Sequence, residues 1–165
     1  DKAIDSLPNK IKQNERSVAE VSAANMRKMI ISERPNNPAY FDKMSELLNQ
    51  LLQEQKDGKL QYKELIGKLI DKRKEARSTV KAKYPASIDT KGKQALYDNL
   101  GNDEALTLRV HDTIKANARD GFRDMDGSGM KKMRALRRAV EGVLQGFEVD
   151  EIENVMQIIV AQKEY

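Results

Sequence analysis

Apolar residues in this chain recur every three to four positions, and proline and glycine separate the stretches in which they do so. The clearest stretch follows Pro38 and ends at Gly58; its apolar positions are Phe41, Met44, Leu47, Leu48, Leu51 and Leu52. This spacing places the apolar side chains on one face of an α-helix, whereas a strand would need alternation. No alternating pattern persists beyond a few residues anywhere in the sequence. Helices are therefore the expected elements throughout.

The same breaks predict an all-α fold, an irregular bundle of about seven helices with one long N-terminal helix. That helix is expected over about residues 9–33, because Pro8 precedes it and Pro35 follows it. The others are expected over about residues 38–58, 60–83, 90–100, 103–121, 130–145 and 150–163. Residues 1–35 would form the long helix, and residues 36–165 the C-terminal helical bundle.

Composition excludes several kinds of chemistry. The 165 residues include no cysteine and one histidine, His111, so disulfides, structural zinc and thiol catalysis are not expected. No apolar stretch approaches the 18 residues of a membrane span, and a cysteine-free chain fits a cytoplasmic location. The start lacks Met and a signal pattern, so we expect a segment of a longer protein.

Motifs for nucleotide and metal binding are also missing from the sequence. It contains no phosphate-binding G-x-x-x-x-G-K-[ST] loop, and no G-x-G-x-x-G after a strand. Asp124–Gly129 imitates the first half of a calcium-binding EF-hand loop, but Ala135 stands where a bidentate glutamate is needed and Lys131 adds a cation. We therefore expect a flexible turn there, no cofactor or metal, and no enzyme activity from this chain alone.

The net charge of +4 is unevenly distributed. Residues 59–99 hold eleven basic and five acidic residues, whereas residues 1–58 are neutral and residues 100–165 have a net charge of −2. One cluster without an acid stands out in the last part: Lys131, Lys132, Arg134, Arg137 and Arg138. On a helix, Lys131, Arg134 and Arg138 would lie opposite the apolar face, whereas Lys132 and Arg137 would flank the apolar face. Such a face could contact nucleic-acid phosphates, or it could simply be solvated.

Three helices carry polar residues on their expected apolar sides. Arg73 falls between Leu69 and Ala76 of the helix expected over 60–83. Its guanidinium must pair with a carboxylate, or this face must meet another protein or an anion; a structural ion pair is the preferred interpretation. Asn117 shares a face with Ile114, and Asn14 and Asn25 are expected on the apolar side of the first helix. These amides need hydrogen-bond partners inside the bundle or across an interface.

Short blocks along almost the whole chain resemble a known family. The most distinctive blocks are NPAYFDKMS (37–45), ALYDNLG (95–101) and DGFR (120–123); the others are residues 3–8, 11–14, 18–20, 25–28, 84–85 and 164–165. In their order and spacing they resemble the C-terminal helical region of the R subunit, the motor and endonuclease subunit, of type I restriction-modification enzymes. The glycine-rich stretch 125–130 departs from that pattern.

The resemblance implies a cytoplasmic parent subunit that uses ATP and Mg²⁺ to translocate and cleave DNA, and none of that machinery lies in this chain. It implies an assembly module that attaches the motor to the methyltransferase (M) subunit and the rest of the R subunit, with residues 1–35 leading from the motor domains. Tyr97, Asp98, Asn99 and Phe122 are then expected to form a docking surface, supported by Arg73 and Asn117. The basic cluster at 131–138 would contact double-stranded DNA non-specifically. The alternative is a purely structural bundle that packs on the motor and contacts neither DNA nor a partner.

Overall fold

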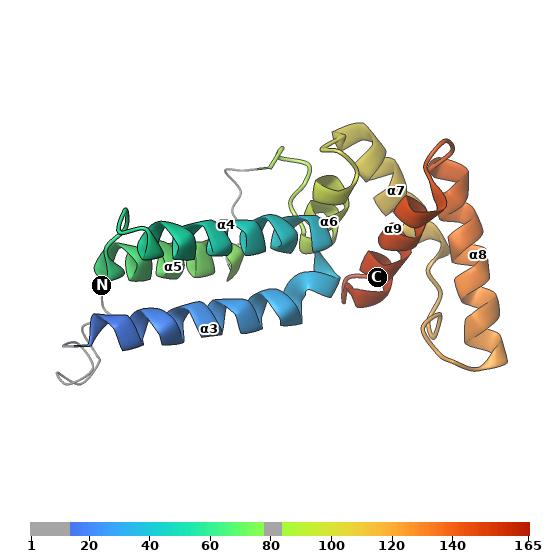
Figure 1. Cartoon of the computed structure of the whole chain (residues 1–165). Coiled ribbons are helices and arrows are strands. Elements are labelled where there is room, and N and C mark those ends of the chain that lie inside the picture. The colour runs from blue at the N-terminus through green and yellow to red at the C-terminus, as the bar shows by residue number, and fades with distance from the viewer. Residues whose placement is uncertain (1–13, 78–83) are drawn as a thin grey trace. The chain divides into compact units, whose positions relative to one another are not determined.

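The computed structural model describes residues 14–77 and 84–165, and every regular element in these ranges is helical. In chain order (Figure 1) they are α3 (Glu15–Glu33), the short 3₁₀ helix η1 (Arg34–Asn36), α4 (Pro38–Lys56), α5 (Tyr62–Arg77), α6 (Lys91–Asn99), α7 (Glu104–Asn117), α8 (Gly127–Val143) and α9 (Val149–Ala161). The predicted all-α class and its long first helix are confirmed. The predicted helical residues 9–13 and 78–83 lie outside the described residues.

Contacts divide the chain into two compact units. The described part of unit 1 comprises residues 14–33 and 41–77, and that of unit 2 comprises residues 34–40 and 84–165. Helix α3 packs against α5 in unit 1, so the contacts do not set the long helix apart from residues 36–165. The division after residue 40 falls inside α4. Unit 2 is thus assembled from two separate stretches of sequence.

Unit 1 has an aliphatic core built by one face of each of its three helices. The buried residues are Ala19, Ala23, Met26 and Ile30 from α3, Phe41, Met44, Leu48 and Leu51 from α4, and Leu65, Ile66 and Leu69 from α5. The positions buried on α4 follow the predicted three-to-four-residue spacing. The predicted place of Asn25 on the apolar side of α3 is wrong, because Asn25 is exposed and the buried side consists of Ala19, Ala23, Met26 and Ile30.

The core of unit 2 gathers residues from α6, α7, α8 and α9. Its members are Ala95, Leu96, Leu100, Leu106, Val110, Ile114, Phe122, Leu136, Val140, Leu144, Val155, Met156, Ile158 and Ile159. Helix α7 packs on both α6 and α8, and α9 contacts α6 and η1. Residues from segment 34–40 therefore belong to the same packed unit as the C-terminal helix.

Helix α8 begins three residues earlier than predicted. Asp126 is its N-cap and accepts a hydrogen bond from the Gly129 amide at 2.6 Å, so Gly127 to Gly129 form the first helical turn. The expectation of a flexible turn at Asp124–Gly129 is corrected for these residues. The aspartate satisfies a backbone donor that the helix start would otherwise leave unpaired, and this offsets the cost of the glycines.

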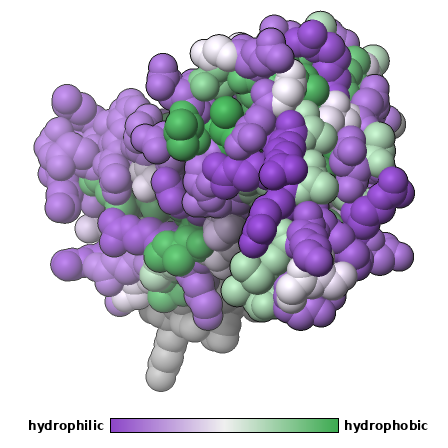
Figure 2. Space-filling model, turned by 90° about the vertical axis from the view of Figure 1, so that its right-hand side faces the viewer, coloured by the Kyte–Doolittle hydropathy of each residue, from purple (hydrophilic) through white to green (hydrophobic). Residues whose placement is uncertain are grey.

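The described helices are too short or too polar to cross a membrane. Figure 2 shows mostly hydrophilic residues on one face of the molecule, with hydrophobic residues in small separate groups. Such scattered apolar residues are ordinary on a protein surface and need no special explanation.

Candidate nucleic-acid interface

Helix α8 holds its basic residues in register because its opposite face is buried. Leu136 and Val140 are completely buried in the core of unit 2, and Met133 packs against the same core. These three residues fix the rotation of the helix about its axis. The side chains that lie opposite them must therefore point away from unit 2.

The structure separates the five predicted DNA-contact residues into two groups. Lys131, Arg134 and Arg138 are exposed, whereas Lys132 and Arg137 are half-buried. This arrangement agrees with the helical positions expected from the sequence. Positions i, i+3 and i+7 form one row along α8, about 10 Å long at 1.5 Å per residue.

The two half-buried cations are engaged within unit 2. Lys132 Nζ donates to the Asp120 carbonyl oxygen at 2.7 Å. Arg137 donates to Glu141 at 2.9 Å and to Glu153 at 2.8 Å, and these two carboxylates raise the pKa of its guanidinium. Both side chains thus serve the attachment of α8 to its neighbours, and they are poorly placed to contact a ligand.

The three exposed cations form what we call the α8 cationic row: Lys131, Arg134 and Arg138. Among the described residues no acid pairs with any of the three. Small residues, Ala135 and Gly142, lie on the same exposed side of the helix. A row of unpaired cations with little side-chain bulk around it can approach a line of phosphates closely, and it offers no group for reading bases.

Two of the predicted docking residues are used inside unit 2. Asp98 accepts hydrogen bonds from Asn37 Nδ2 and from the Tyr84 hydroxyl, each at 2.7 Å. The Asn99 amide donates to the Asn37 side chain and the Ala95 carbonyl, and accepts from the Ala39 amide and Asn154. These bonds tie segment 34–40 to the end of α6. Tyr97 is half-buried, with its ring edge-on to that of Tyr84 at 5.9 Å.

Phe122 does not lie on a docking surface. It is 3% exposed and packs in the core of unit 2, so the expectation for this residue is corrected. The guanidinium carbon of Arg123 lies 4.1 Å from the centre of its ring. An aromatic residue in a short loop can be buried when a neighbouring helix leaves room for its ring. The spacing of loop residues in the sequence does not predict such burial.

The two predicted structural polar residues have different environments. Asn117 is half-buried, and its amide donates to the Thr113 carbonyl at 2.8 Å, one turn back on α7. Arg73 is half-buried in unit 1, but its Nε is buried without a hydrogen-bond partner. No ion pair joins Arg73 to another described residue, and the expected structural ion pair stays a prediction.

A polar cluster that the sequence analysis missed binds the last residues of the sequence to α6 and α7. The Glu164 carboxylate accepts from the Thr90 hydroxyl at 2.9 Å and from the Gly92 amide at 2.8 Å. An added Cβ at Gly92 would lie 2.5 Å from that carboxylate, so a larger residue there would displace the Glu164 side chain. The Tyr165 hydroxyl lies 2.9 Å from His111 Nδ1.

Arg123 completes this cluster from the loop between α7 and α8. Its guanidinium donates to the carbonyl oxygens of Ile159, Val160, Gln162 and Tyr165. A cation at the C-terminal end of α9 also complements the helix dipole. The DGFR and Glu164–Tyr165 blocks, which are far apart in sequence, therefore meet in unit 2. Both blocks belong to the set that carries the family resemblance, but nothing in the sequence indicates that they contact each other.

No family model, curated protein or solved structure matches this chain. Within the described residues, no group of three histidine, aspartate or glutamate side chains is arranged to hold a metal ion. The resemblance to the R subunit of type I restriction enzymes is thus neither supported nor opposed by comparison.

Proposed function

We propose that this chain is a non-catalytic helical module of a type I restriction enzyme motor subunit, and that it contacts the backbone of double-stranded DNA through the α8 cationic row. The single observation that supports the DNA contact is the row itself, three exposed cations on one helix face with no acidic partner in the described residues. Attachment to the methyltransferase subunit and the cytoplasmic setting belong to the same proposal, and rest on the resemblance.

The number of phosphate contacts proposed is three, because Lys132 and Arg137 already have partners within unit 2. Each neutralised phosphate of B-DNA contributes roughly −0.9 to the slope of the logarithm of the binding constant against the logarithm of salt concentration. Contact through the row alone therefore predicts a slope of about −2.7. Contact through all five basic residues would give about −4.5.

A second candidate function is a structural bundle that touches neither DNA nor a partner subunit. It is favoured by the internal use of Asp98 and Asn99 and by the burial of Phe122, because these residues then stabilise unit 2 rather than a docking surface. On this alternative the cationic row is a solvated helix face. The two functions differ in the salt dependence of DNA binding.

The test is a salt titration of binding to a duplex of random sequence, measured by fluorescence anisotropy. The triple variant Lys131→Gln, Arg134→Gln, Arg138→Gln should bind at least tenfold more weakly at low salt, and most of the slope should disappear. The matched control is the double variant Lys132→Gln, Arg137→Gln, which removes charge from the same helix. Its slope should remain close to that of the native chain.

Equal losses in the two variants would show that net charge, and not the row, governs the binding. Absence of measurable binding by the native chain at low salt would overturn the DNA contact and leave the structural bundle. Circular dichroism of each variant verifies that the helices are retained. In the full-length subunit the triple variant should still assemble with the methyltransferase, because the row is proposed to face DNA only.

A further inference from the structure

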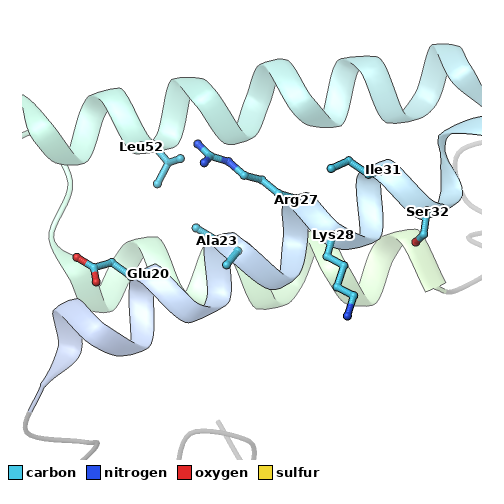
Figure 3. Close-up of a pocket in the computed structure, with 8 residues that line it drawn as sticks. Glu20, Ala23, Arg27, Lys28, Ile31, Ser32 and Leu52 are labelled. Atoms are coloured by element: carbon cyan, nitrogen blue, oxygen red, sulfur yellow. The ribbon is translucent and has the colours of Figure 1, made fainter.

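A groove of about 710 Å³ runs along α3 in unit 1. Its lining residues are Glu20, Ala23, Ala24, Arg27, Lys28, Ile31 and Ser32 from α3, and Leu52 from α4. Figure 3 shows the Arg27 side chain extending from α3 toward α4, beside Leu52. The groove therefore has an apolar floor with charged side chains at its margins.

Among the described residues of unit 1, no element covers the helix face beside this groove, and Glu20, Ala24, Arg27 and Ile31 are all exposed. Glu20, Ala24, Arg27 and Ile31 follow one another at spacings of four, three and four residues, so they form a single line along α3. Ile31 also lines the groove, and it is 75% exposed although it is a large aliphatic residue. The residues buried against α5 lie on a different side of the helix, at Ala19, Met26 and Ile30.

Charge along this line changes sign at its centre. Glu20 lies one turn before Ala24, whereas Arg27 and Lys28 lie one turn after it. Glu20 accepts a hydrogen bond from Arg16 through Oε1 at 2.9 Å, which leaves Oε2 for a second donor. Arg27 and Lys28 have no hydrogen bond or ion pair to another described residue.

We propose that this α3 face binds the same face of a second copy of the chain, with the two helices antiparallel and Ala24 near the two-fold axis. Antiparallel pairing sets Glu20 of each copy against Arg27 and Lys28 of the other, so symmetry makes the favourable contact twice. The alanines at the centre allow the helix backbones to approach closely. The contact also covers part of Ile31.

A second copy fits this face better than a helix of uniform charge. A wholly acidic partner would repel Glu20, and a wholly basic one would repel Arg27 and Lys28, whereas an antiparallel copy satisfies both ends. The proposal is independent of the proposed function, because it concerns α3 in unit 1 and the cationic row belongs to α8 in unit 2.

The test is sedimentation equilibrium of the whole chain over a range of concentrations. The native chain should form dimers, and two variants should each weaken dimerisation at least tenfold: Glu20→Arg, and the double variant Arg27→Glu, Lys28→Glu. Each variant alone places like charges against each other. An equimolar mixture of the two should recover dimers, because every contact across the mixed interface is then between opposite charges. The matched control is Glu46→Arg, the same charge change at an exposed position of α4 outside the groove.

Recovery on mixing distinguishes lost charge complementarity from lost folding, since two misfolded chains would not restore each other. A native chain that stays monomeric at all concentrations would overturn the proposal. So would dimers that tolerate both charge reversals, because they would then form through another surface. In the salt titration above, each dimer-weakening variant should bind DNA as a native monomer does. The native chain can differ from the variants only by the added affinity of a dimer that binds through two copies of the row.

Discussion

Asn99 is the residue on which the joint between segment 34–40 and α6 depends most directly. Its side-chain amide has two donor hydrogens and an oxygen that can accept two bonds, and all four are used. Because it is half-buried, water cannot easily replace a lost partner. A side chain of the same shape with different donors should therefore be poorly tolerated.

We expect Asn99→Asp to lower the free energy of unfolding by about 1–3 kcal/mol, because the carboxylate cannot donate to Asn37 and Ala95. It would also stand next to Asp98, which adds a like charge. Urea denaturation followed by circular dichroism measures the change. The control is Asp112→Asn on the exposed side of α7, where a change of at most about 0.5 kcal/mol is expected. Similar effects at both positions would show that the Asn99 bonds contribute little.

At the scale of the helices, two of the three glycines in α8 have sharply different surroundings. A Cβ added to Gly129 would overlap the Asp124 carbonyl oxygen, and the Gly121 carbonyl oxygen lies close by as well. A Cβ added to Gly142 would meet no atom within 4 Å. One glycine is thus required for packing the start of the helix, whereas the other only weakens it.

Alanine substitutions at these two sites should have opposite signs. Gly129→Ala is expected to lower the unfolding free energy by about 1–3 kcal/mol through overpacking against backbone. Gly142→Ala should raise it by about 0.5–1 kcal/mol, because alanine has the better helix propensity. Thermal and urea unfolding of the two single variants make the comparison. A stabilising effect of Gly129→Ala would mean that the α8 start is not packed as described.

Most helix positions could be predicted from the sequence, since Pro, Gly and capping residues act locally. Pro38 begins α4 as expected, and Asn37 accepts from the Tyr40 amide as a cap should. The start of α8 was missed because glycines usually mark a break, and the capping bond of Asp126 outweighs that tendency here. At the start of α8 the local rule therefore fails because a single cap overrides composition.

The candidate site was predictable only in part, for a physical reason. The helical repeat assigns Lys131, Arg134 and Arg138 to the exposed side, because burial on α8 follows from its apolar residues alone. Whether Asp98 or Phe122 faces solvent depends instead on contacts with other segments of the chain. Asp98, for example, is bound by Asn37, which lies 61 residues earlier in the sequence. Such contacts leave no periodic signal in a single sequence.

At the scale of the whole molecule, His111 links the stability of unit 2 to pH. It is 8% exposed, and burial lowers its pKa below the ordinary value of 6.5. Glu164, 3.9 Å away, and Asp112 act in the opposite direction, whereas Lys93 and Lys115 lower the pKa further. The unfolded chain thus binds a proton at a higher pH than the folded chain does.

The stability contributed by neutral His111 should be complete above about pH 6.5 and should be lost as the pH falls through the lowered pKa of the folded state. We expect the unfolding free energy to decrease from pH 7 to pH 5, and the decrease to be smaller in His111→Gln. Urea denaturation at pH 7, 6 and 5 gives both slopes. Parallel slopes for the two proteins would contradict the assignment to His111.

The composition of unit 2 from two stretches of sequence has a consequence for synthesis on the ribosome. Segment 34–40 is synthesised early, but the Asn36 carbonyl accepts a hydrogen bond from the side chain of Gln162, which is synthesised 126 residues later. At roughly 5–20 residues per second, that delay is about 6–25 s. The described residues of unit 1 are complete well before then, whereas unit 2 closes only after α9 has emerged. A nascent chain stalled before α9 should accordingly carry a protease-resistant α3–α5 unit and a cleavable remainder.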